Sequence, residues 1–72
     1  MSKEYNVGDE FYLTNNTEGH IFTIEEKGDK GVVISWYSEA SKKRLTEHHS
    51  RERMDYWFDN GFHTLIKKDD GL

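Results

Sequence analysis

Apolar residues along the chain fall into short groups that are separated by polar or glycine-containing stretches. Within most groups, β-branched and aromatic residues cluster or alternate with polar ones, which is typical of strands. The intervening stretches are rich in Asn, Gly, Ser or charge and favour turns. The pattern predicts five short strands, over residues 10–13, 20–24, 32–37, 44–48 and 62–66.

One helix is predicted between the fourth and the fifth of these strands. Ser50 is a typical N-cap residue, because its hydroxyl can accept a hydrogen bond from an amide of the first turn. Gly61 suits the left-handed position that follows a helix, so we expect the helix over residues 51–60. Helical periodicity predicts a buried side made of Met54, Trp57 and Phe58.

This order of elements predicts the fold class. A sheet of short, twisted strands tends to curl, so we expect a small SH3-like barrel of about five antiparallel strands, with one short helix before the last strand. The polar ends lack periodicity, which predicts a flexible N-terminus over residues 1–6, a single SH3-like domain over residues 7–66 and a flexible tail over residues 67–72. Periodicity assigns to the core Phe11, Leu13, Phe22, Ile24, Val32, Ile34, Trp36, Leu45, Met54, Trp57, Phe58 and Ile66.

Composition narrows the class of protein. The chain has 72 residues, no Cys and no Pro, and 14% of its residues are aromatic. Without disulfides, so short a chain depends on its aromatic core for stability. No apolar stretch is long enough to span a bilayer, and the N-terminus lacks the apolar segment of a signal peptide. We therefore expect a cytoplasmic protein that does not contact membranes.

Several segments, in this order along the chain, carry a resemblance to a known group of proteins. They are Val7-Gly8-Asp9 with Phe11, Phe22-Thr23-Ile24, Val32 with Ile34 and Trp36, and Trp57-Phe58 with Gly61-Phe62 and Leu65-Ile66. This pattern resembles the small SH3-like hypothetical proteins of bacteriophages and mobile elements, over residues 7–66. All of these are core or turn positions, so no functional residue is transferred. The resemblance implies a protein that binds and inhibits or redirects one host protein or complex.

Charge is distributed unevenly along the chain. The net charge is −4, but residues 1–40 carry eight acidic and three basic side chains, whereas residues 41–68 carry four acidic and seven basic ones. The basic second half permits a local anion-binding patch. The acidic total opposes non-specific binding to nucleic acid, for which a positive net charge is expected.

Catalytic and metal-binding patterns are not found in the sequence. Its two carboxylate pairs, at residues 25–26 and 69–70, lie in a predicted loop and in the predicted tail rather than in one cleft. No nucleophile motif or phosphate-binding glycine loop occurs. His48 and His49 are adjacent and would point to opposite sides of a strand, so they cannot chelate one zinc ion. We expect neither enzymatic activity, nor a metal, nor a cofactor.

Two binding functions are left, and both depend on exposed aromatic and basic side chains. Binding to a host protein is the first, because Tyr and Arg are enriched at interface hot spots; its mechanism would be steric occlusion or charge mimicry. The candidate protein-binding residues are Tyr12, Tyr37, Tyr56, Arg44, Arg51 and Arg53. An incomplete sheet also leaves open that the chain completes its core as a homodimer.

The alternative function is that of a small nucleic-acid-binding module. Aromatic side chains beside basic ones can stack on the bases of a single strand while the basic groups contact phosphates. The acidic net charge makes this the less favoured of the two functions. The candidate nucleic-acid-binding residues are Lys42, Lys43, Arg44, Tyr37 and Tyr56.

Overall fold

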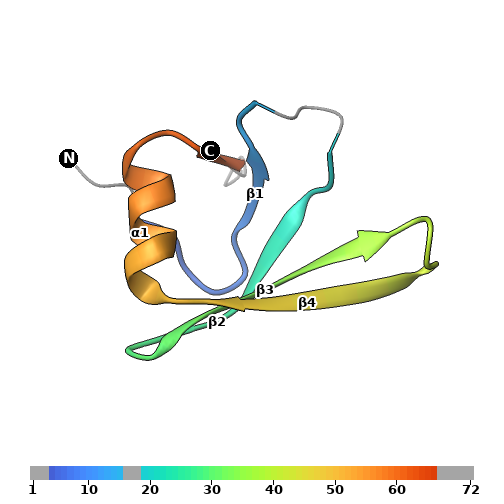
Figure 1. The fold of residues 1–72 in the computed structure, drawn as a ribbon, viewed down its shortest axis with the longest axis horizontal. Helices are drawn as coiled ribbons and strands as arrows, with labels where there is room; N and C mark the ends of the chain where they lie inside the picture. Colours follow the sequence, from blue (N-terminus) through green and yellow to red (C-terminus); the bar gives the residue numbers. More distant parts are fainter. Residues whose placement is uncertain (1–3, 16–18, 67–72) are drawn as a thin grey trace, which may run out of the picture.

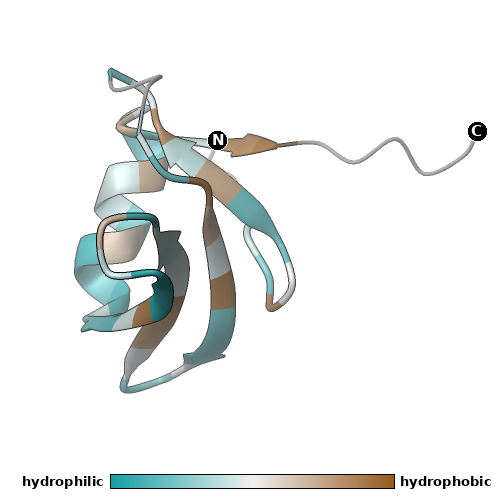
Figure 2. Cartoon of the chain, turned by 90° about the vertical axis from the view of Figure 1, so that its right-hand side faces the viewer, coloured by the Kyte–Doolittle hydropathy of each residue, from teal (hydrophilic) through white to brown (hydrophobic). Residues whose placement is uncertain are grey.

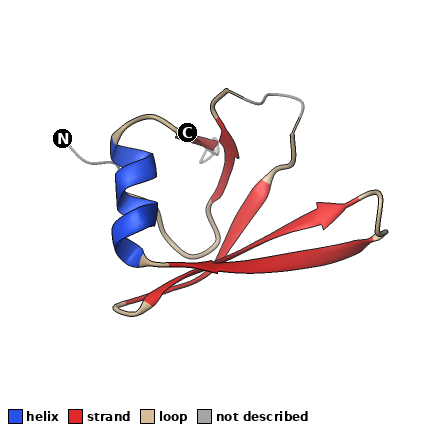
Figure 3. Ribbon diagram, viewed as in Figure 1, coloured by secondary structure: helices blue, strands red, loops and turns tan. Residues whose placement is uncertain are grey.

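A computed structural model of the chain describes residues 4–15 and 19–66. Residues 1–3 of the predicted flexible N-terminus and the whole predicted tail, residues 67–72, lie outside the described part. The elements within it, shown in Figures 1 and 3, are β1 (Glu10–Leu13), β2 (Phe22–Gly28), β3 (Gly31–Ser38), β4 (Lys43–His49), α1 (Arg51–Asp59) and β5 (His63–Ile66). The predicted order of elements is confirmed. The largest difference is in β2, which continues to Gly28 through a stretch that the sequence assigns to a loop.

The strands form one antiparallel sheet in the order β4-β3-β2-β1-β5. A register shift between Ile24 and Glu26 marks a bulge in β2, which increases the local bend and twist of the strand. Figure 1 shows the consequence, since β1 turns steeply away from the long β3–β4 pair. Figure 2 shows brown and teal bands alternating along the strands, as expected where one side of a sheet is buried.

Within the described residues, no strand pairing joins the two edge strands β4 and β5, so the sheet is open. Helix α1 follows β4 and leads back to β5 across this opening (Figure 1). The mainly β architecture with one helix before the last strand is therefore confirmed. Closure into an SH3-like barrel stays a prediction.

The ends of α1 form as the sequence predicts. The Ser50 hydroxyl oxygen accepts a hydrogen bond from the amide of Arg53 at 3.1 Å, which satisfies one of the free donors of the first turn. After the C-cap residue Asn60, Gly61 takes a φ of 80°, a left-handed conformation that glycine adopts without steric cost.

The core lies between the sheet and α1. Its buried hydrophobic residues are Tyr5, Phe11, Ile24, Val32, Ile34, Met54 and Phe58. All of these except Tyr5 were assigned to the core by periodicity. Five of the other residues assigned to the core are only half-buried, because one short helix cannot cover the whole side of an open sheet: Leu13, Phe22, Trp36, Leu45 and Trp57. The assignment of Ile66 is wrong. Leu65 pairs with the buried Phe11 and packs against the core, so β5 turns the side with His63 and Leu65 inward and the side with Ile66 outward.

Tyr5 is the core residue that the sequence pattern does not identify, because it lies in a polar end without periodicity. Its side chain is 2% exposed, and its ring stacks on Phe58 with the centroids 4.5 Å apart. The Tyr5 hydroxyl donates a hydrogen bond to Asp55 Oδ1 at 2.5 Å. The Lys27 ammonium lies 4.3 Å from the ring centroid and donates to the Tyr5 backbone carbonyl. These contacts attach the N-terminal segment to both α1 and β2.

Burial, and then the hydrogen bond to Asp55, raise the pKa of Tyr5 from 10.0 to about 12. The folded state thus favours the protonated phenol, so this contribution to stability is complete below pH 10 and is lost as the pH rises from 10 to 12.

Replacing Tyr5 by phenylalanine is expected to lower the free energy of unfolding by about 1–3 kcal/mol at neutral pH, because a hydrogen bond to a carboxylate is lost. The same substitution should also reduce the decrease in the free energy of unfolding between pH 10 and pH 12. Chemical denaturation measures both, with Tyr56→Phe as the exposed control; equal losses in the two variants would contradict this role of Tyr5.

Candidate functional site

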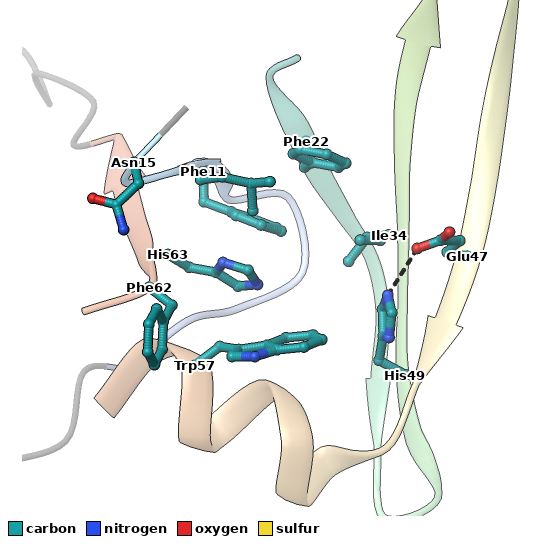
Figure 4. Close-up of a pocket in the computed structure, with 10 residues that line it drawn as sticks. Phe11, Asn15, Phe22, Ile34, Glu47, His49, Trp57, Phe62 and His63 are labelled. Atoms are coloured by element: carbon teal, nitrogen blue, oxygen red, sulfur yellow. Dashed lines mark hydrogen bonds and ion pairs between the residues drawn. The ribbon is translucent and has the colours of Figure 1, made fainter. Parts of the chain in front are cut away.

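An open groove of about 410 Å³ crosses the inner side of the sheet, and we call it the aromatic groove. It is lined by Phe11, Leu13, Asn15, Phe22, Ile34, Glu47, His49, Trp57, Phe62 and His63. Figure 4 shows Phe11 of β1, Trp57 of α1 and His63 of β5 on one side of the groove. Phe22 of β2, Ile34 of β3 and His49 of β4 lie on the other side (Figure 4). The groove exists because β4 and β5 do not pair, which leaves apolar side chains without a covering layer.

An exposed pair of aromatic side chains lies at the edge of the aromatic groove. Phe62 lines the groove, and its ring stacks on that of Tyr56 with the centroids 6.1 Å apart. The amide of Phe62 donates to the carbonyl of Trp57 at 2.8 Å, which fixes the turn after α1. Tyr56 is 56% exposed and Phe62 45% exposed. We call these two residues the rim pair.

His63 contributes a polar group to the interior of the groove. Its side chain is 6% exposed and is stacked on Phe11 at 4.7 Å between centroids, with the Trp57 ring at 5.0 Å. Its Nδ1 atom is shielded from solvent and has no hydrogen-bond partner of normal geometry among the described residues. Figure 4 shows the ring projecting into the groove.

Electrostatics keep the His63 ring neutral. Burial lowers the pKa of His63 from 6.5; an interaction of the ring with the Phe62 backbone partly opposes this shift, and the neighbouring His49 adds a smaller lowering effect. On the opposite wall, His49 Nε2 and Glu47 Oε1 form a hydrogen bond of 2.9 Å. The aromatic groove therefore combines apolar walls with two imidazoles and one carboxylate that already has a partner.

The six residues predicted to bind protein do not share one surface. Tyr37 and Arg44 pair on the side of the sheet that faces away from α1. Tyr12 is half-buried opposite Thr64 of β5, away from the aromatic groove. The other three candidates are on α1: Arg51, Arg53 and Tyr56.

Arg44 has a structural role that its sequence position does not indicate. Its guanidinium donates to the hydroxyl oxygens of Ser35 and Thr23, both at 3.0 Å. Ser35 is buried and donates in turn to Glu25 Oε2 at 2.6 Å. These bonds satisfy a buried hydroxyl and hold the Arg44 side chain against the sheet.

On α1, two of the three candidates adjoin the aromatic groove. The Arg53 guanidinium lies 5.8 Å from the centroid of Trp57, and Tyr56 belongs to the rim pair. Both of them also line a second hollow, together with Trp57. Arg51 instead lies 3.7 Å from Asp55 and donates to the carbonyl of Gly28, so it connects α1 to the end of β2.

The residues predicted to bind nucleic acid are separated in the same way. Lys42 and Lys43 are exposed at the turn between β3 and β4, near Tyr37 and Arg44. Tyr56 is on α1, and Figure 1 shows α1 at the opposite end of the β3–β4 pair from that turn. Lys42, Lys43, Arg44 and Tyr37 therefore lie together, without Tyr56.

Sequence reasoning did not identify the aromatic groove. It placed Trp57 in the core and considered His48 and His49 only as zinc ligands, because a pairing such as Trp57 with His49 depends on how distant segments meet. The centroids of these two rings are 5.2 Å apart. One usable signal was the sequence Gly61-Phe62, in which a large apolar residue follows a helix-ending glycine.

Comparisons with protein-family models, with curated proteins and with solved structures find no match to this chain. Among residues 4–15 and 19–66, no group of three or more His, Cys, Asp or Glu side chains is arranged to hold a metal ion. Helices long and apolar enough to cross a membrane do not occur in the same part of the chain.

Proposed function

We propose that this protein is a non-enzymatic binding protein that acts through a protein partner and contacts it with the aromatic groove and the rim pair. The observation that carries the proposal is the stacked, exposed pair of Tyr56 and Phe62 beside a preformed apolar groove. Binding hot spots combine such aromatic anchors with desolvated pockets. An apolar side chain of the partner would enter the groove, and the rim pair would contact the partner residues next to that side chain.

The fold, the kind of partner and the mode of action complete the proposal. An SH3-like fold is supported by the antiparallel order β4-β3-β2-β1-β5 with α1 before the last strand. A host protein as the partner, inhibited or modulated in the cytoplasm, follows from the resemblance to phage proteins. The net charge of −4 favours a partner with a basic surface, through charge mimicry or steric occlusion.

Affinity capture from a nuclease-treated host lysate tests this function. The tagged protein is expected to retain one protein in stoichiometric amounts, and Tyr56→Ala and Phe62→Ala should each weaken that capture by roughly tenfold or more. Both side chains are about half exposed, so the variants should stay folded. Tyr37→Ala is the matched control, because Tyr37 is similarly exposed on the other side of the sheet. Capture that depends on Tyr37 and not on the rim pair would contradict the proposed surface.

The same preparation discriminates the alternative functions. Retention of labelled oligonucleotides that is lost on combined Lys42→Ala and Lys43→Ala changes, with an affinity that falls linearly in log salt, would favour the nucleic-acid-binding module. Capture of a second copy of this chain would instead indicate a homodimer.

A further inference from the structure

We propose that the aromatic groove receives the side chain of a tyrosine from the protein partner, with the phenol hydroxyl hydrogen-bonded to His63. This inference rests on the proposed function, because it names the chemical group that the groove binds. Three properties of the groove, as formed by the described residues, carry the inference: a buried imidazole whose Nδ1 has no partner of normal geometry, walls without a free charge, and aromatic rings along those walls.

The imidazole of His63 is a buried polar group of the groove, and its Nδ1 atom has no hydrogen-bond partner of normal geometry among the described residues. Only 6% of the His63 surface is exposed. Burial therefore removes the hydration of Nδ1 without replacing it by a hydrogen bond within the described part of the chain, which costs free energy. It projects into the groove between Phe11 and Trp57 (Figure 4). Because Nδ1 is shielded from solvent, the ring has to turn towards the groove before a ligand can reach this atom. A ligand that then hydrogen-bonds to Nδ1 binds more tightly than one that only makes apolar contacts, because it satisfies a buried polar atom.

The charge of the groove selects a neutral ligand group. Burial keeps the pKa of His63 low, so the ring offers no positive charge to a carboxylate or a phosphate at neutral pH. Glu47 is the one lining residue, among those described, that carries a formal charge, and it is already paired with His49. Because burying an unpaired charge is costly, ammonium groups and carboxylates are both disfavoured in the groove.

The geometry of the groove then selects a ring that carries a hydroxyl. Its walls include the rings of Phe11, Phe22 and Trp57, which favour an aromatic ligand through stacked and edge-to-face contacts. A neutral imidazole has one donor and one acceptor nitrogen, and either nitrogen can carry the hydrogen. A phenol hydroxyl both donates and accepts, so it fits either form. An indole N–H only donates, and a phenyl ring does neither.

Binding of capped amino acids to the intact, isotope-labelled protein tests this inference. In NMR titrations, N-acetyltyrosine amide is expected to bind roughly tenfold more tightly than N-acetylphenylalanine amide, a difference of about 1.4 kcal/mol. The signals that shift should include those of Trp57 and Phe62. Equal affinities, preference for a charged ligand, or no binding of the tyrosine amide would each overturn the inference. This comparison uses the unchanged protein, so it does not depend on a variant that folds.

A variant then assigns the preference to His63. His63→Phe keeps an aromatic ring at the site and is expected to bind the two amides equally well. His48→Gln, at an exposed neighbour of His49, is the control and should keep the tenfold preference. A preference that survives His63→Phe would overturn the role of His63. Lysate capture that depends on the rim pair, together with equal affinities for the two amides, would leave the proposed function intact while rejecting the tyrosine.

Discussion

Replacing Phe58 by alanine is expected to lower the free energy of unfolding by about 3–5 kcal/mol, the usual cost of removing a fully buried phenyl ring. Phe58 is 0% exposed. Its ring stacks on Tyr5, lies edge-on to Phe11 at 5.2 Å, and contacts His63 at 5.1 Å between centroids. It thus joins the N-terminal segment, β1 and β5 to α1. For a domain of 72 residues, such a loss is comparable with the total stability of about 4–11 kcal/mol.

Thermal and chemical denaturation followed by circular dichroism measure this loss. Phe62→Ala is the matched control, because it removes the same side chain from a position that is 45% exposed. We expect that control to cost less than about 1 kcal/mol. If Phe58→Ala and Phe62→Ala unfolded at the same denaturant concentration, Phe58 would not be the centre of the core.

Replacing Gly31 by alanine is expected to cost about 2–3 kcal/mol, because an added methyl group has no room in the paired strands. A Cβ atom at this position would lie 2.6 Å from the backbone oxygen of His49 and 2.4 Å from Nε2 of His48. The imidazole can move, but the carbonyl belongs to β4, which is held in register by Val32 opposite His49. The φ of 156° adds strain for any residue with a side chain.

Gly28 provides the control at the other end of the same turn. A Cβ atom there would meet nothing within 4 Å, so Gly28→Ala is expected to change the free energy of unfolding by less than about 1 kcal/mol. Urea denaturation of the two alanine variants makes the comparison. Similar stabilities for both variants would show that β4 can shift away from β3 at little cost in free energy. That result would contradict the expected clash between a Cβ atom at position 31 and the backbone oxygen of His49.

Local sequence features predicted most of the backbone. Ser50 and Gly61 marked the ends of α1 because capping depends on residues within one turn of the helix. Alternation placed Phe11, Ile24 and Ile34 in the core, because each strand buries one side. Tyr5 was missed because its burial depends on Phe58, Asp55 and Lys27, which are far away in the sequence and carry no local signal for it.

The candidate site was less predictable than the backbone. The sequence predicted that Tyr56 and Tyr37 are exposed, and both are. It could not show that they lie on different surfaces, nor that Arg44 is held by Ser35 and Thr23. Such facts depend on strand register and on the position of α1, which local pattern does not specify.

The sequence by itself determined the order of the elements, the ends of the helix and the buried side of the first four strands, but not that of β5, where His63 and Leu65 rather than Ile66 face the core. These follow from hydrogen bonding and side-chain periodicity within a few residues. The tertiary structure alone decided that, within the described part of the chain, β4 and β5 do not pair with each other, Tyr5 joins the core, and His63 lies in an aromatic groove with Nδ1 unpaired. Those features arise where segments far apart in the chain meet, and their energies depend on contacts that no single segment contains.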